Sequence, residues 1–564
     1  MKLKITTFGV AWLVLGILVF VVVLLPLLHT INAAFYAETD VGLSDERSLQ
    51  TVIDVYLGAD YLRYLWNALL LSAVVTALSM AIGIAMALLV GRSDIPAKGV
   101  IDMLVLVPLF LSPLTGLISW ISLGSGSTGF LNMAFRAVTG STTTLFDIWS
   151  YGGIVWVMVL FFTPFAYLFT LGSLRQMDGS LEEAARMSGA SVLKTIFRIT
   201  LPMSLPAIFA AALLIFILAA EMYTIPGMIG TNIGFTTLPW RIYQDATSYP
   251  VRLAHSAASG TVLLWIAIVG LVIQQRITRA SERFVTVSGK GYQGTPLRLG
   301  AVKIPALIFV IGYILLSVVL PFGTLVVSSL MKYSAATLTP DIWTLKHYHD
   351  IWNIPRLQRS ITATLMLAVL SGVIVVFVGV MISFAELRRP SFSSKALAFL
   401  GVLPVAVPGL VYGIGLLWTY SATPVYGTIW VLLLAYVAKF LPYGVLISRS
   451  GIMQIHPDLE HSARMSGASQ LQAMRLILMP LMRMTLVSVL FFVMLMSMKE
   501  ISASLLLSSG RTQVLSVLTW TYMDSGNYQL AAAIGVVQTL LMLALVIGVR
   551  ALFGVRLESA MSAK

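Results

Sequence analysis

Eleven residues occur twice in this chain, and their charged and small side chains suit protein binding better than catalysis. Leu181–Ser191 reads LEEAARMSGAS and Leu459–Ser469 reads LEHSARMSGAS, so nine of eleven positions are identical. Both copies lie in polar loops between long apolar stretches, which resemble one another far less than the loops do. The stronger constraint on the loops indicates that a partner docks on both.

The rest of the sequence offers little that would support enzymatic chemistry. It contains no G-x-x-x-x-G-K-[ST] phosphate loop and no H-E-x-x-H motif. It has no cysteine, and its six histidines are not spaced as metal ligands. We expect no enzymatic activity of the chain itself and no cofactor or metal bound by it.

The first copy has the signals of a short surface helix. Ser180 and Glu183 fit a capping box, in which serine is the N-cap and glutamate follows three residues later. Gly189 is placed to end the helix as the C′ residue. An amphipathic stretch follows, and Pro202 marks the entry to the next apolar segment.

The second copy repeats these signals with different residues. Asp458 follows Pro457 and is the expected N-cap. Gly467 repeats the stop and Pro480 repeats the loop-to-span proline. Small side chains in both helices permit close approach of a partner, although the loops could instead fold only against their own spans. The residues expected to form the two docking surfaces are Glu182, Glu183, Ala184, Ala185, Gly189, Glu460, His461, Ser462, Ala463 and Gly467.

The composition places these loops in a polytopic membrane protein. Of the 564 residues, 58% are hydrophobic and only 10% are charged. A membrane span needs about 20 mostly apolar residues, and twelve stretches qualify. They are Phe8–Leu28, Trp66–Val90, Val100–Leu123, Tyr151–Leu171, Leu205–Glu221, Leu253–Gln274, Ile304–Leu330, Ile361–Glu386, Leu397–Tyr420, Tyr426–Ile447, Met484–Met498 and Leu530–Leu552. Leu205–Glu221 and Met484–Met498 are short and could begin earlier.

Loop charge predicts the orientation of these spans. With the N-terminus inside, 24 of the 36 Lys and Arg residues lie on the inside and 11 on the outside. Both termini are therefore expected in the cytoplasm. The net charge of +13 reflects this topology and does not indicate nucleic acid, because no basic helix or aromatic platform accompanies it.

Six spans on each side of a basic, glycine-containing linker predict a tandem repeat. We expect an all-α membrane protein of two parallel six-helix repeats, at residues 1–288 and 289–564, related by an axis along the membrane normal. The repeated loops then occupy about 173–204 and 449–482.

Ionisable residues in or at the ends of predicted spans include Glu221, Glu500, Asp102 and Lys439. Glu221 and Glu500 end the fifth and eleventh spans at positions that look equivalent, and they are candidates for the mouth or gate of a pathway. The alternative is that both carboxylates sit at the water interface without a function. Asp102 and Lys439 are interpreted as structural, with Lys439 reaching toward the cytoplasmic surface.

The repeated loop resembles the EAA signature of binding-protein-dependent ABC importer permeases. The first copy has the whole pattern, from Glu183-Ala-Ala through Gly189 and Ile199 to Leu201-Pro202. The second copy keeps Gly467, Ile477 and Pro480, while His461, Ser462 and Met479 replace the signature glutamate, alanine and leucine.

The resemblance implies a type I importer fold in a bacterial inner membrane. The loops would be coupling helices that dock on two cytoplasmic ABC ATPase subunits, a homodimer that binds ATP and Mg²⁺. The signature glutamate would contact a basic ATPase residue, which Glu183 can do and His461 cannot do as a permanent anion; Glu460 is a candidate substitute. An extracytoplasmic binding protein would deliver the substrate.

The fused layout resembles ferric-iron permeases most, with thiamine, phosphonate, sugar phosphate and polyamine systems as alternatives. A different class, an ion-gradient-driven transporter of twelve spans, would not explain two matched docking loops.

Overall fold

The computed structural model describes residues 7–39, 42–281, 296–335 and 337–553. Two π-helical turns accompany the loop-to-span prolines: η3 (Ile196–Thr200) precedes Pro202, and η10 (Met474–Leu478) precedes Pro480. The expected boundary between residues 288 and 289 lies outside the described residues.

The elements of the first repeat are α1 (Thr7–Val19), α2 (Leu25–Ala33), β1 (Tyr36–Thr39), β2 (Gly42–Arg47), α3 (Gln50–Leu57), α4 (Ala59–Arg92), α5 (Lys98–Leu106), α6 (Pro113–Gly124), α7 (Phe130–Thr139), α8 (Tyr151–Gln176), α9 (Ser180–Met187), α10 (Val192–Thr195), α11 (Leu201–Ala220), α12 (Thr224–Gly230), α13 (Leu238–Thr247) and α14 (Leu253–Ser281). Those of the second repeat are α15 (Lys303–Ile314), α16 (Leu320–Ser329), α17 (Lys346–Asn353), α18 (Pro355–Arg388), α19 (Phe392–Val402), α20 (Gly409–Tyr420), α21 (Ile429–Met453), α22 (Asp458–Met465), α23 (Gln470–Ala473), α24 (Met479–Leu481), α25 (Arg483–Met498), α26 (Ser502–Leu507), α27 (Leu515–Asp524) and α28 (Tyr528–Phe553). Strands β1 and β2 form an antiparallel hairpin in which Thr39 pairs with Gly42.

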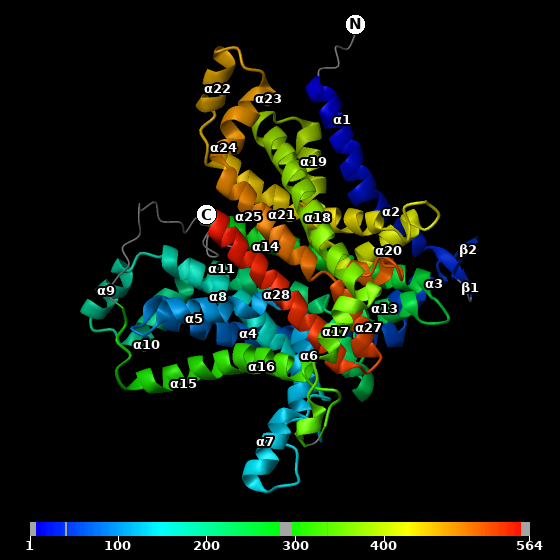
Figure 1. Cartoon of the computed structure of the whole chain (residues 1–564). Helices are drawn as coiled ribbons and strands as arrows, with labels where there is room; N and C mark the ends of the chain where they lie inside the picture. The colour runs from blue at the N-terminus through cyan, green and yellow to red at the C-terminus, as the bar shows by residue number, and fades with distance from the viewer. Residues whose placement is uncertain (1–6, 40–41, 282–295, 336, 554–564) are drawn as a thin grey trace.

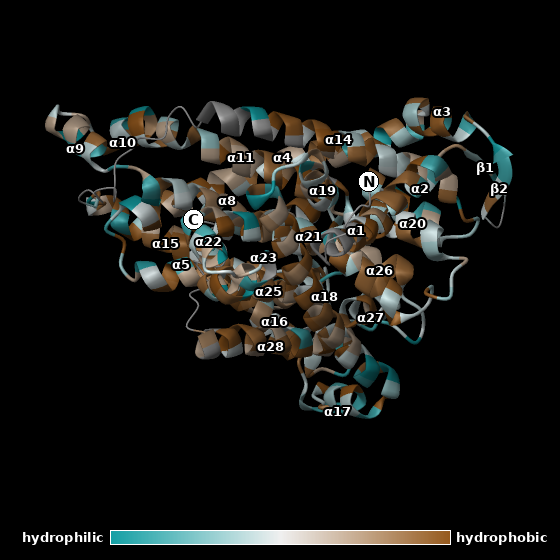
Figure 2. Ribbon diagram, turned by 90° about the horizontal axis from the view of Figure 1, so that it is seen from above, coloured by the Kyte–Doolittle hydropathy of each residue, from teal (hydrophilic) through white to brown (hydrophobic). Residues whose placement is uncertain are grey.

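Each of the twelve predicted apolar stretches corresponds to a membrane-length helical unit. Within the described residues, nine helices are long and apolar enough to span a membrane, and three bent helix pairs bring the total to twelve. The fifth span begins earlier than its apolar core, because Val192–Ala220 forms one continuous helical unit. Apolar residues dominate the bundle, and polar ones gather at α9, α10, β2 and α17 (Figure 2).

The third and ninth spans are broken, which corrects their prediction as single helices. The two helical segments of the third span meet at 99°, and those of the ninth span meet at 113°. Proline explains both breaks, since it lacks an N–H donor and clashes with the preceding turn. Pro108 and Pro113 flank the first break, while Pro404 and Pro408 flank the second. Each break leaves main-chain groups inside the membrane that need other partners.

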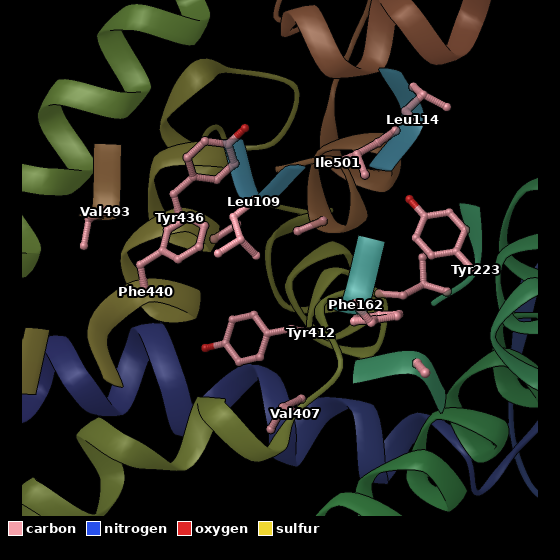
Figure 3. Packing of buried hydrophobic residues seen from close by; sticks show 14 of the residues in the cluster. Leu109, Leu114, Phe162, Tyr223, Val407, Tyr412, Tyr436, Phe440, Val493 and Ile501 are labelled. Atoms are coloured by element: carbon pink, nitrogen blue, oxygen red, sulfur yellow. The ribbon is translucent and has the colours of Figure 1, made fainter. Parts of the chain in front are cut away.

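The first span of each repeat packs on the other repeat. Helix α2 lies against α20, and α16 lies against α6. Gly415 permits the first contact, because a Cβ there would be only 2.4 Å from the Pro26 carbonyl oxygen. The Tyr412 hydroxyl donates to the Val22 carbonyl, and Figure 3 shows this tyrosine close to the dark blue ribbon of the first helices. This exchange joins the two repeats into one bundle.

Candidate functional site: coupling helices and the membrane interior

The repeated loops form two short helices that project from the bundle. Helices α9 and α22 each span eight residues and lie well apart, at the ends of separate arms (Figure 1). Both end in the same hydrogen-bond pattern: Ala190 N–H donates to Ala185 O, and Ala468 N–H donates to Ala463 O, each at 3.0 Å. The predicted glycine stops are confirmed.

Gly189 and Gly467 have left-handed backbones, with φ of +83° and +90°. This conformation favours glycine, because other residues place Cβ too close to the backbone. The two turns therefore leave their helices in the same direction.

The predicted N-caps are wrong. The N-cap of α9 is Gly179, and Ser180 is already helical. Ser180 instead donates its main-chain N–H to the Asp178 carboxylate at 2.9 Å. In the second copy the N-cap is Pro457, and Asp458 lies in the first helical turn. The negative charges of Asp178 and Asp458 still interact favourably with the positive N-terminal ends of the two helix dipoles.

The outward faces of α9 and α22 are closely matched. Met187 and Met465 are each 89% exposed, and Leu181 and Leu459, near the starts of the same helices, are exposed too. Ala184 and Ser462 are also exposed, whereas Glu183 is half-buried and His461 exposed. Unbranched methionine adapts readily to an apolar groove. Two similar apolar projections are thus presented by one chain.

The neighbouring acids, Glu182 and Glu460, face the interior. Glu182 is buried, 3.4 Å from the Nε of Arg92, and accepts a hydrogen bond from the Thr200 hydroxyl at 2.8 Å. Glu460 is also buried and accepts a hydrogen bond from Arg388 Nε at 2.8 Å. The carboxylate of Glu460 is engaged within the chain, which contradicts its expected role as a substitute for the missing glutamate at position 461.

Each arginine also binds the end of the helix that precedes the coupling helix. Arg92 Nη2 donates to the carbonyls of Leu174 at 2.7 Å and Met177 at 3.0 Å. Arg388 Nη2 donates to those of Ile452 at 3.4 Å and Ile455 at 2.7 Å. A cation at a helix C-terminus satisfies free carbonyls and complements the helix dipole. We call each arginine with its glutamate and two carbonyls a clamp.

The start of the second repeat attaches beside the first clamp. Leu297 N–H donates to the Arg92 carbonyl at 2.8 Å, and Asp94 N–H donates to the Leu297 carbonyl at 3.1 Å. Asp94 Oδ1 accepts from Leu299 N–H at 2.9 Å, and Oδ2 lies 3.6 Å from Lys303 Nζ. The Leu299 N–H first, and then Lys303, hold the pKa of Asp94 below its ordinary value although desolvation opposes them. We call 297–303 the strap.

The two acids proposed for a gate are not equivalent. Glu221 is the C-cap of α11, and the C-cap of α25 is Lys499. The equivalence predicted for Glu221 and Glu500 was wrong by one residue, since Glu500 corresponds to Met222 at the 278-residue offset of the repeated loops. The membrane ends of these spans therefore carry opposite charges in the two repeats.

Glu500 is held inside the protein rather than at a water interface. It is 4% exposed, and its carboxylate accepts hydrogen bonds from Lys439 Nζ and from the N–H groups of Ser502 and Ala503, each at 3.0 Å. Lys439 therefore points inward, which contradicts its predicted reach toward the cytoplasmic surface. Glu221, half-buried, lies within electrostatic reach of both groups.

Lysine and aromatic side chains join the repeats near these acids. Lys499 Nζ donates to the Leu109 carbonyl at 2.8 Å, beside the break of the third span. On the side away from the coupling helices, Trp520 lies 5.9 Å from Trp240, 5.8 Å from Tyr243 and 6.2 Å from Tyr223, measured between ring centroids. These contacts pack the two repeats against each other at that end.

Comparison with known families agrees with this arrangement. The chain matches the family described as "Binding-protein-dependent transport system inner membrane component" over residues 79–287 and again over 376–559. The chain belongs to this family. It is therefore a multi-pass inner-membrane permease, and both family segments contain a coupling helix with its clamp.

Relatives of this permease include ferric transporters. It is 25% identical to the ferric transport system permease protein FbpB of Actinobacillus pleuropneumoniae, over 87% of this chain and 71% of the relative. It is 24% identical to the probable ABC transporter permease protein y4fN of Sinorhizobium fredii, over 85% of this chain and 83% of the relative.

Other matches cover less of the permease. A putative 2-aminoethylphosphonate transport system permease protein, PhnU of Salmonella typhi, is 29% identical over 36% of this chain and 71% of the relative. Among solved structures, a bacterial ABC transporter for import of the polysaccharide alginate matches 45% of this chain and 96% of that chain, with 18% identity and a TM-score of 0.37.

Sequence reasoning missed Arg92 and Arg388, because arginines at the cytoplasmic ends of spans look like ordinary positive-inside residues. A signal was present: each arginine ends a helix of 34 residues that occupies the same place in its repeat.

Proposed function

We propose that this permease forms the translocation pathway of an ATP-driven importer for ferric iron. Ferric permease relatives that match 87% and 89% of this chain support the substrate, and the two matched coupling helices support the energy source. An extracytoplasmic binding protein delivers the substrate, and two identical cytoplasmic ATPase subunits, which hold ATP and Mg²⁺, bind α9 and α22. The observation that carries the proposal is the duplicated exposed face of these helices.

The coupling helices would insert Leu181 and Met187, and their equivalents Leu459 and Met465, into grooves of the two ATPase subunits. Glu183 supplies the carboxylate of the EAA signature on the first side, and His461 stands in that place on the second. Pro202 and Pro480 then mark where the motion enters the fifth and eleventh spans. With the docking helices inside, both termini lie in the cytoplasm, in agreement with the basic inner loops.

Glu221 and Glu500 belong to the pathway in this proposal. Charged groups in a membrane interior face cavities or partners. Both acids lie near the aromatic contacts that join the repeats, and this supports a position for them behind a closed outer mouth. In this role Glu221 contacts the passing substrate, and Glu500 fixes Lys439.

Uptake of radioactive ferric iron by vesicles that contain the permease, its ATPase and its binding protein tests this function. We expect uptake that requires both ATP and the binding protein. Uptake by the permease alone, driven by an ion gradient, would instead identify a secondary transporter. Two-aminoethylphosphonate is the first competing substrate to measure, because phosphonate permeases match the chain as well.

A further inference from the structure

We propose that Arg92 and Arg388 are positioning residues that transmit the motion of the coupling helices to the second and eighth spans. This inference rests on the proposed ATP-driven function. Each guanidinium joins three elements: the end of its own long helix, the end of the helix that precedes the coupling helix, and the coupling helix itself. The first clamp joins α4, α8 and α9, and the second joins α18, α21 and α22.

The clamps link parts that otherwise have little contact. Among the described elements, α9 packs closely on α10 and η3, and α22 packs on α23 and η10. Their backbones do not pack closely on α4 or α18, so the buried side chains of Glu182 and Glu460 provide the direct connection to those helices. A force on a coupling helix therefore reaches the long helices through the arginines as well as through the following span.

The clamp is preserved where the sequence spacing is not. Leu174, Met177 and Glu182 lie 278 residues before Ile452, Ile455 and Glu460, but Arg92 lies 296 residues before Arg388. The first repeat contains eighteen more residues between arginine and glutamate, in the region of α7, and still brings Arg92 to the equivalent carbonyls and within 3.4 Å of its glutamate. Both repeats therefore place an arginine between the coupling helix and the end of the helix before it, although their lengths differ.

The chemistry of the joint requires arginine. A planar guanidinium presents donors in two directions at once, so Arg388 binds the carboxylate through Nε and the carbonyls through Nη2. In the first clamp, Arg92 Nη2 binds the carbonyls and Nε lies 3.4 Å from the Glu182 carboxylate as an ion pair. Lysine has a single charged nitrogen and cannot reproduce this fixed fork. Both arginine side chains are largely buried, which limits competition from water.

Substitution of each arginine by glutamine, singly and together, tests transmission. We expect the double variant R92Q/R388Q to bind and stimulate the ATPase while iron transported per ATP hydrolysed falls by about 5- to 150-fold, the usual range of coupling between sites. The lysine variants R92K and R388K should not restore the ratio. The exchange R388E/E460R should recover part of the loss relative to R388E.

Spin-label distances separate transmission from a structural role. The chain has no cysteine, so cysteine pairs can be introduced without background. One pair replaces Ser188 and Ser466, the exposed C-cap residues of the two coupling helices; the other replaces Leu62 and Gln358, exposed residues near the far ends of α4 and α18. With ATP, both distances should change in the wild type, whereas in R92Q/R388Q only the coupling-helix distance should change.

Several outcomes would overturn the inference. An unchanged transport-to-ATP ratio, or preserved motion at residues 62 and 358 in the double variant, shows that the clamps do not transmit. Loss of ATPase binding shows that they shape the docking surface instead. If the wild-type permease itself lacks ATP-dependent uptake, the proposed function fails, and the two failures are therefore distinguishable.

Discussion

The ends of the two repeats that carry the coupling helices are nearly copies of each other, whereas the membrane interior between them is not. Both ends have an eight-residue coupling helix, a left-handed glycine and an arginine clamp. In the interior, Glu221 of the first repeat corresponds to Lys499 of the second, and Phe161 corresponds to Lys439 at the 278-residue offset.

The difference follows from what each region contacts. Two identical ATPase subunits would require two similar docking surfaces, so drift there is costly on either side. A substrate on the axis meets both repeats at once and requires no symmetry from them. Charges within the interior could therefore diverge, provided that each buried charge retained a partner, as Lys439 and Glu500 do.

Substitution of Glu500 by glutamine gives the largest expected effect on stability. It removes the counter-charge of Lys439 in a buried site, and loss of one partner from such a pair costs about 3–5 kcal/mol. We expect a clear drop in the thermal unfolding temperature of the purified permease. Glu221→Gln is the matched control and should leave that temperature unchanged while reducing uptake. Equal unfolding temperatures for the two variants would show that Glu221 and Glu500 contribute equally to stability, in contradiction to their different contacts.

Substitution of Gly189 or Gly467 by valine should impair uptake strongly and to a similar degree. A non-glycine residue in the left-handed conformation costs roughly 1–2 kcal/mol, and a β-branched one more. The turn would relax and reorient its coupling helix. Iron uptake at constant ATPase content measures the effect. Gly172→Val is the control, because this glycine has open space for a Cβ and no positive φ. A defect in only one of the two glycine variants would mean that the two coupling helices differ in function although their structures are similar.

Glu183 and His461 provide a smaller, asymmetric effect. We expect Glu183→Gln to lower iron transported per ATP several-fold, since it removes the signature carboxylate. His461→Gln should have little effect, because no permanent charge is lost. The measurement is the transport-to-ATP ratio of each variant. Identical ratios would show that the difference between Glu183 and His461 has no functional effect. In that case His461→Glu should also leave the ratio unchanged.

Thr200 gives the smallest expected effect. Its hydroxyl donates to Glu182, whereas the equivalent Leu478 offers no donor. Thr200→Val should cost about 0.5–1.5 kcal/mol of folding stability, the usual worth of one hydrogen bond. Differential unfolding measurements would detect it, and Thr200→Ser, which keeps the hydroxyl, serves as the control. A large loss of uptake would show that the first clamp depends on this hydroxyl.

The span count, the tandem repeat and the glycine stops were accessible from sequence, because each depends on local composition or on a short motif. The breaks in the third and ninth spans were not predicted, although Pro108, Pro113, Pro404 and Pro408 gave a local signal. Hydropathy averaged over a span conceals such a break, since proline and its neighbours remain apolar.

The clamps and the charge partners were not predictable in the same way. Arg92 and Glu182 are ninety residues apart, and nothing local in the sequence pairs them. The predicted equivalence of Glu221 with Glu500 was wrong because the two repeats were aligned by residue type, which shifted the match by one position. The ends of helices α11 and α25 give the correct match, Glu221 with Lys499. Pairing of Lys439 with Glu500 depends on how two helices rotate against one another, which periodicity alone leaves open.

The strap attaches the start of the second repeat to a specific place on the first. Leu297, Leu299 and Lys303 recognise Arg92 and Asp94 through main-chain bonds and one ion pair. If the chain were divided between residues 288 and 289, each fragment would be a six-span protein. The second fragment would have the strap near its N-terminus. We expect such fragments, when co-expressed, to be recovered as one complex that Asp94→Ala weakens. In the intact chain, the same contact joins the start of the second repeat to the loop that follows α4.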